Sequence, residues 1–188
     1  MIIVVDIRPA PALGGTWTLP GWTLQGRWNP NEAERRASWD LLVELVTRVS
    51  VVPLGENQGL LREALGSLHA LFDATRATLV RHGPELAVAR RGELSFAVIS
   101  AHLLNAVLRP VLVEWHPRLL AHEAASPPGG PPTPASERAW DGYDDLRTLL
   151  RSLQAVVVQY ARVFAVACDA EEFVRFLVDS VDHPGQAD

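Results

Sequence analysis

The chain has 188 residues, enough for one domain with a sizeable hydrophobic core. Apolar residues make up 48 % and charged residues 21 % of it, as in globular proteins. The net charge of -5 argues against direct binding of nucleic acid, which needs a clustered basic surface. A single cysteine, Cys168, excludes an internal disulfide and a cysteine-rich zinc site.

The first residues carry no sign of a targeting segment. The chain begins with MIIVVDIRP, which lacks the basic stretch and the long apolar core of a signal peptide. No run reaches the ~18 uninterrupted apolar residues of a membrane span. We therefore expect a cytoplasmic protein that does not bind a membrane.

Residues 1–28 are predicted to form a β or extended segment. Residues 2–7 are expected to be a strand, and a near-repeat follows, Trp17-Thr-Leu-Pro-Gly21 and Trp22-Thr-Leu-Gln-Gly26. Thr, Trp and Leu favour strands, whereas Pro-Gly favours a turn, so we expect a short hairpin or an extended arm. Trp17 and Trp22 are candidates for binding a partner protein. The alternative is that the arm covers the open end of its own helical core.

Two helices are predicted next. Asn29 is expected to cap the first, with Pro30 at its first position and Glu32 three residues after the cap. Pro53 and Gly55 are expected to end it. The second helix is predicted over residues 59–82, because its leucines recur at alternating steps of four and three.

The third predicted helix contains the longest apolar run. It covers residues 94–120, where Pro110 should kink it and Pro117 should bend or end it. Four polar side chains recur in this helix at steps of three, four and seven: His102, Asn105, Arg109 and His116. That spacing places them along one face. We expect much of this helix to be buried, and a buried arginine needs a partner.

Two interpretations of these polar residues stay open. One is a hydrogen-bond network that repairs the helix break at Pro110, with Glu114 or Asp73 neutralising Arg109. The other is a pocket in which Arg109 holds an anionic ligand. The ligand or network candidates are His102, Asn105, Arg109, Glu114 and His116.

The remaining chain is predicted to complete a helical bundle. Residues 124–135 are rich in proline and glycine and are expected to be a flexible loop. A fourth helix is predicted over residues 136–168, and Asp169 with Glu172 should open a short fifth helix. We expect an all-α fold, an antiparallel four-helix bundle over residues 29–183, with a disordered tail at 184–188.

No catalytic or metal motif accompanies this pattern. The dinucleotide, P-loop, hydrolase and zinc-protease patterns are absent. A di-iron bundle would need Glu-x-x-His motifs, and the chain has none. We therefore predict no catalytic residues, no metal and no cofactor.

One stretch of the third predicted helix resembles a known group of proteins. The motif is Leu108-Arg109-Pro110-Val111-Leu112-Val113-Glu114-Trp115-His116-Pro117, or LRPxLxxWHP. It is similar to a family of uncharacterised bacterial helical proteins, mostly actinobacterial, across residues 28–168. The resemblance implies an association with conflict or defence gene clusters, and it implies no activity.

The sequence is interpreted as that of a non-catalytic adaptor or regulatory subunit that binds another protein, in a hetero-complex or a homo-oligomer. The alternative is a sensor that binds a small molecule or nucleotide at the polar face of the third helix. An enzyme of unknown type ranks third, because no nucleophile and base can be paired.

Overall fold

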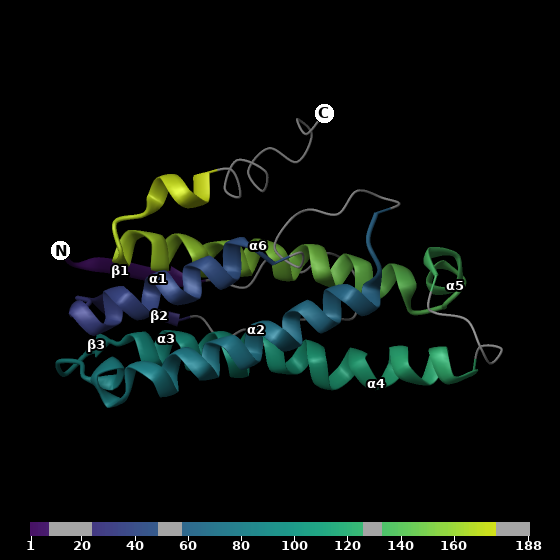
Figure 1. The fold of residues 1–188 in the computed structure, drawn as a ribbon, viewed down its shortest axis with the longest axis horizontal. Helices are drawn as coiled ribbons and strands as arrows, with labels where there is room; N and C mark the ends of the chain where they lie inside the picture. The colour runs from purple at the N-terminus through teal and green to yellow at the C-terminus, as the bar shows by residue number, and fades with distance from the viewer. Residues whose placement is uncertain (8–23, 49–57, 126–132, 176–188) are drawn as a thin grey trace.

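The computed structural model describes residues 1–7, 24–48, 58–125 and 133–175 of the chain. Over these residues the protein is mainly helical, as predicted, and it has a small three-stranded sheet whose third strand was not predicted. Figure 1 shows the long helices running along the long axis, with the sheet near one end and α5 at the other. Their bounds are α1 Glu32–Val46, α2 Leu61–His82, α3 Phe96–His102, α4 Arg109–Ala125, α5 Pro134–Arg138 and α6 Tyr143–Ala167.

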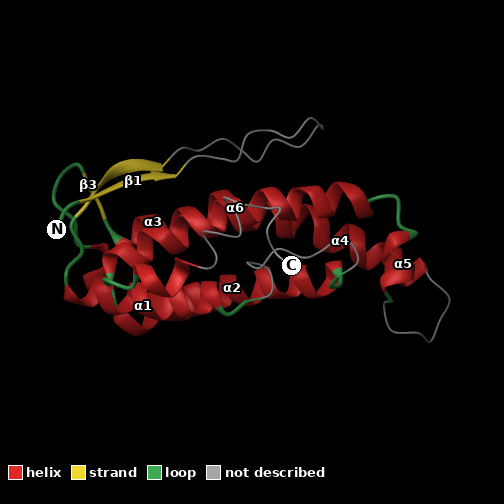
Figure 2. Ribbon diagram, turned by 90° about the horizontal axis from the view of Figure 1, so that it is seen from above, coloured by secondary structure: helices red, strands yellow, loops and turns green. Residues whose placement is uncertain are grey.

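The sheet is formed by β1 (Ile3–Ile7), β2 (Leu24–Trp28) and β3 (Glu93–Leu94). β2 lies between the others, antiparallel to β1 and parallel to β3. The short β3 follows a 3-10 turn, Pro84–Ala87, in the connection from α2 to α3. A Cβ atom on Gly26 would lie 2.7 Å from the Cγ of Leu94, so a larger residue there would push β3 away. Figure 2 shows the sheet beside the helices.

The first strand is part of the protein core. Its side chains alternate, with Ile3, Val5 and Ile7 buried, while Val4 is 75 % exposed. Trp28 at the end of β2 is fully buried and meets Phe164 of α6 edge-on, with ring centroids 6.3 Å apart. The described parts of residues 1–28 therefore share one core with the helices. Trp17 and Trp22 lie outside the described residues.

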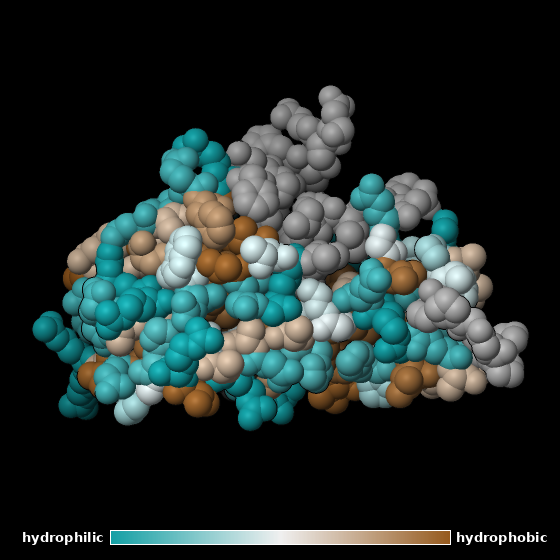
Figure 3. All heavy atoms as spheres, in the orientation of Figure 1, coloured by the Kyte–Doolittle hydropathy of each residue, from teal (hydrophilic) through white to brown (hydrophobic). Residues whose placement is uncertain are grey.

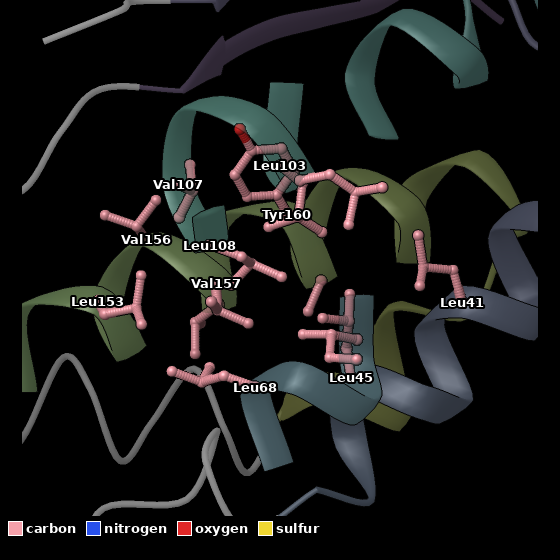
Figure 4. Packing of buried hydrophobic residues seen from close by; sticks show 14 of the residues in the cluster. Leu41, Leu45, Leu68, Leu103, Val107, Leu108, Leu153, Val156, Val157 and Tyr160 are labelled. Atoms are coloured by element: carbon pink, nitrogen blue, oxygen red, sulfur yellow. The ribbon is translucent and has the colours of Figure 1, made fainter. Parts of the chain in front are cut away.

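The helical core is aliphatic and draws on every long helix. Figure 4 shows leucines and valines of α1, α2, the 103–108 segment and α6 pointing toward one another, with Tyr160 among them. α1 packs against both α2 and α6, and α2 packs against α4. Most labelled side chains in that view are less than 2 % exposed, so the contact between helices excludes water.

The cap of α1 differs from the predicted one. Asn31, not Asn29, is the N-cap, because its Oδ1 accepts from the N–H of Glu34 while Glu34 accepts from the N–H of Asn31. Glu34 is 1 % exposed, and its carboxylate also accepts from Trp28 Nε1 at 3.1 Å and from the N–H of Phe96 at 2.7 Å. This one carboxylate therefore joins β2, α1 and the start of α3.

A second buried carboxylate caps α2 from a distant part of the chain. The N-cap residue Leu60 has no capping side chain. Instead, the carboxylate of Glu137 in α5 accepts from the N–H groups of Leu61 at 2.7 Å and Arg62 at 3.0 Å. Arg62 also pairs with Glu123 near the end of α4. α2, α4 and α5 are thus tied together at this end, and the predicted span of α2 is confirmed to within two residues.

The third predicted helix continues through both prolines. α3, a π-helical segment at Leu103–Leu108 and α4 form one helical run from Phe96 to Ala125. The N–H of Arg109 donates to Leu104 O, five residues back, so the wider π turn precedes Pro110. Pro117 lies inside α4 and is exposed. Of the two predicted effects of Pro117, a bend or an end of the helix, the end is wrong.

The fourth predicted helix is divided in two. Thr133 caps α5, and the chain turns at residues 139–142 before α6 begins. At this turn Trp140 folds over Gly142, where an added Cβ atom would lie 2.5 Å from the indole. α4 extends to Ala125 and α5 begins at Pro134, so both helices reach into the predicted 124–135 loop. Residues 126–132 of that loop lie outside the described residues.

Asp169 ends a helix rather than opening one. It adopts φ 55° after α6, and the N–H of Ala170 donates to Ala165 O at 2.9 Å. This is the Schellman arrangement, in which glycine is usual. The carboxylate of Asp169 pairs with Arg35 of α1. Residues 171–175 are helical, and the predicted tail at 184–188 lies outside the described residues.

Candidate functional site on the outer face of the α3–α4 run

The five polar candidates of the α3–α4 run do not form one network. His102 bonds to the hydroxyl of Tyr160 in α6, and His116 stacks on His69 of α2. Glu114 pairs with Arg118 one turn along, at 3.3 Å. Only Asn105 and Arg109 contact each other directly among the candidates, through the bond from Arg109 Nε to Asn105 Oδ1 at 3.0 Å.

Arg109 is exposed, which corrects the expectation of a buried arginine. Its guanidinium lies 5.4 Å from the centre of the Phe72 ring, a cation–π contact, and bonds to Asn105. Neither predicted carboxylate neutralises it, because Glu114 pairs with Arg118 and Asp73 lies 3.5 Å from His69. The side chain is therefore held in place at the surface without a carboxylate among the described residues.

Asn105 does not bond the carbonyl group that Pro110 was expected to free near residue 106. Its amide donates instead to Ala101 O at 2.9 Å, one turn before Asn105. Arg109 does not act on the backbone, because its guanidinium contacts Asn105 and Phe72. The wider π turn, rather than the arginine, accommodates Pro110.

Arg109→Ala is expected to change the free energy of unfolding by less than about 1 kcal/mol, since exposed cation–π contacts and surface hydrogen bonds contribute little. Urea unfolding of the two proteins would measure this difference. A loss near 3 kcal/mol would contradict the exposed placement, because only a stranded buried partner gives so large a cost.

The histidine pair lies on the surface between α2 and α4. The rings of His69 and His116 are 6.0 Å apart and 29° from parallel. Burial and the neighbouring positive charges of Arg62 and His69 lower the pKa of His116, although Glu123 opposes them. His116 is therefore neutral at pH 7. Within the described ranges, no three His, Cys, Asp or Glu side chains are grouped so that they could share a metal ion.

The remaining reactive groups are held in inert surroundings. Burial raises the pKa of the Tyr160 hydroxyl, which bonds to His102. Burial also raises the pKa of the Cys168 thiol, whose Sγ lies 3.2 Å from Phe164 O. Both groups therefore stay protonated at neutral pH and are weak nucleophiles.

The feature that sequence reasoning missed is the outward face of the α3–α4 run. From residue 98 to residue 124 the exposed residues follow one another mostly at steps of three and four. We call them the outer ridge: Val98, Ala101, Asn105, Arg109, Val113, Pro117, Leu120, Ala121 and Ala124. Only Asn105 and Arg109 among them are polar. Val113 is 68 % and Leu120 60 % exposed. Figure 3 shows apolar patches along the edge where α4 lies.

The outward face of α2 is polar, as is usual for a surface helix, and it can be compared with the outer ridge. Its exposed residues are mostly polar or charged: Glu63, Gly66, His69, Asp73, Arg76, Ala77, Val80 and Arg81. A helix at the surface of a globular protein usually has one apolar and one polar face. The α3–α4 run is apolar on both, which is typical of a helix with partners on two sides.

Two helical runs of the described chain are long and apolar enough to cross a membrane. These are Phe96–Ala125 and Tyr143–Ala167. Core helices of soluble proteins meet the same criterion, and 44 % and 56 % of the most apolar windows of these runs are buried inside the structure. Length and composition are therefore weak evidence for a membrane span.

The indoles of the described chain are mainly buried. Trp115 of α4 meets Trp140 edge-on, with ring centroids 5.9 Å apart, and His122 stacks on Trp140. Within the sequence motif, Trp115 is therefore part of the core. Comparison with known proteins gives no identity: no family model matches the chain, and no curated protein or solved structure matches it.

Proposed function

We propose that this chain is a non-catalytic adaptor or regulatory subunit, built as a four-helix bundle, that binds a protein partner through the outer ridge. The observation that carries the proposal is the contrast between the exposed faces of two neighbouring helices. The ridge has seven apolar residues among nine, whereas the exposed face of α2 is mostly polar. Large exposed apolar surfaces on soluble proteins mark interaction sites.

The chemistry of the ridge suits a protein partner. Burying a side chain such as Val113 or Leu120 contributes about 1.5–3 kcal/mol. Arg109 is already held by Asn105 and Phe72, so its ordering costs less entropy when a partner binds.

The test is a double substitution on the ridge, Val113→Ser with Leu120→Ser. Both side chains are exposed, so the fold should be kept, as measured by circular dichroism and thermal melting. The purified chain is immobilised and exposed to an extract of its source cells, and retained proteins are measured by quantitative mass spectrometry. We expect retention of the specific partner to fall by about tenfold or more.

A matched control removes two exposed valines elsewhere. Val80 is 83 % and Val88 68 % exposed, and both lie outside the ridge. Val80→Ser with Val88→Ser should leave retention unchanged. Equal retention by the ridge variant and the wild-type chain would reject the proposal.

A further inference from the structure

We infer that the partner of the outer ridge is the outer ridge of a second copy of this chain, packed antiparallel to the first. This inference rests on the proposed function and specifies the partner of the same surface. It is drawn from the spacing of the ridge and from the placement of its one charged residue.

The spacing of the ridge is symmetric. From Val98 to Ala124 the steps are 3, 4, 4, 4, 4, 4 and 3 when Ala121 is taken as the seventh position, and Val111 lies at the midpoint. The six central positions, from residue 101 to residue 121, form one row at intervals of four. Rows of this kind on two helices interdigitate in the commonest mode of helix packing. Because helices packed in this way cross at about 50°, a two-fold axis at the level of residue 111 brings the central positions of the two rows together.

This arrangement matches residues in a specific way. It places Asn105 opposite the partner's Pro117, and Arg109 opposite the partner's Val113. Every contact occurs twice, as a two-fold interface requires.

Charge complementarity supports the second copy as the occupant. Arg109 has no carboxylate partner among the described residues, and covering a guanidinium without one is costly. Between residues 96 and 122 the only acidic residue is Glu114, which borders the ridge with a side chain that is 44 % exposed. In the antiparallel arrangement, Arg109 faces the partner's Val113, and the next residue, the partner's Glu114, lies at the edge of that contact within reach of the guanidinium. Two such pairs form across the axis.

The test uses the full chain and measures its mass in solution. Size-exclusion chromatography with light scattering, at several protein concentrations, should give twice the monomer mass of 20.6 kDa. Arg109→Glu and Glu114→Arg should each weaken dimerisation by about tenfold or more, because each places like charges opposite each other. The double reversal, R109E with E114R, should restore the dimer. Arg151→Glu, at an exposed position of α6, is the matched charge-reversal control and should remain dimeric.

The outcomes separate this inference from the proposed function. A wild-type chain that is monomeric at every concentration would overturn the second-copy inference, while the extract experiment would still decide whether the ridge binds another protein. A dimer that survives both single reversals would also overturn it, because another surface would then hold the copies together. Single reversals that dissociate the dimer without rescue by the double reversal would reject the pairing of Arg109 with the partner's Glu114. Circular dichroism of each variant verifies that the fold is kept.

Discussion

Glu34→Ala is expected to lower the free energy of unfolding by about 2–6 kcal/mol, because it leaves two buried hydrogen-bond donors without their acceptor. The carboxylate accepts from Trp28 Nε1 and from the N–H groups of Asn31 and Phe96. Its removal leaves two buried donors, those of Trp28 and Phe96, without their acceptor, and each costs about 1–3 kcal/mol. Urea unfolding followed by tryptophan fluorescence would measure the change.

A matched variant separates the effect of the buried carboxylate from that of any acidic residue in the first turn of a helix. Glu32, also in the first turn of α1, is exposed and pairs only with Arg36 at 3.6 Å. Glu32→Ala should cost less than about 0.5 kcal/mol, as surface pairs do. Similar effects of the two substitutions would contradict the role assigned to Glu34.

Val5→Asp is expected to destabilise the protein by more than about 3 kcal/mol, because it removes a buried side chain and places a carboxylate among apolar groups. Val5 is fully buried in β1, while its neighbour Val4 is 75 % exposed. Val4→Asp should therefore change the free energy of unfolding by less than about 0.5 kcal/mol. Thermal melting of both variants measures the contrast.

The two variants, Val5→Asp and Val4→Asp, test whether the N-terminal strand belongs to the core of the protein. An independent arm would tolerate both substitutions equally, and the helices would melt as in the wild-type chain. A cooperative melt that shifts only with the Val5 substitution would show that strand and helices unfold together.

Short-range sequence patterns were sufficient to predict those helices and strands that are determined by neighbouring residues. The periodic leucines predicted α2 over residues 59–82, and the helix ends at His82. The apolar residues at the start predicted β1, although alternation along the chain could not say what it packs against. These features depend on neighbouring residues, so a single sequence carries them.

The N-cap residue of α1 could not be predicted from the sequence, because it depends on contacts between residues that are far apart in the chain. Asn29 and Asn31 are both followed by a glutamate three residues later, so both fit a capping box. The choice of Asn31 is coupled to the bonds that Glu34 receives from Trp28 and Phe96, and Phe96 is 62 residues away.

The candidate site shows the same limit. The spacing of His102, Asn105, Arg109 and His116 predicted a shared face, but the structure turns His102 toward α6 and His116 toward α2. Because apolar residues surround the run on all sides, the sequence could not show which face is outward. Arg109 and Val113 are exposed because the neighbouring helices pack against the other side of the run, and the sequence does not show which side that is.

The capping of α2 by Glu137 has a consequence for synthesis of the chain. The helix begins at Leu61, yet the acceptor for its first N–H groups lies 76 residues later. During translation, the start of α2 lacks this acceptor until residue 137 has left the ribosome. The first turn of α2 is therefore expected to become protected from hydrogen exchange late, after α4 and α5 have been made. A ribosome-bound chain that ends before Glu137 should exchange the amide protons of Leu61 and Arg62 rapidly, whereas the complete chain should retain them.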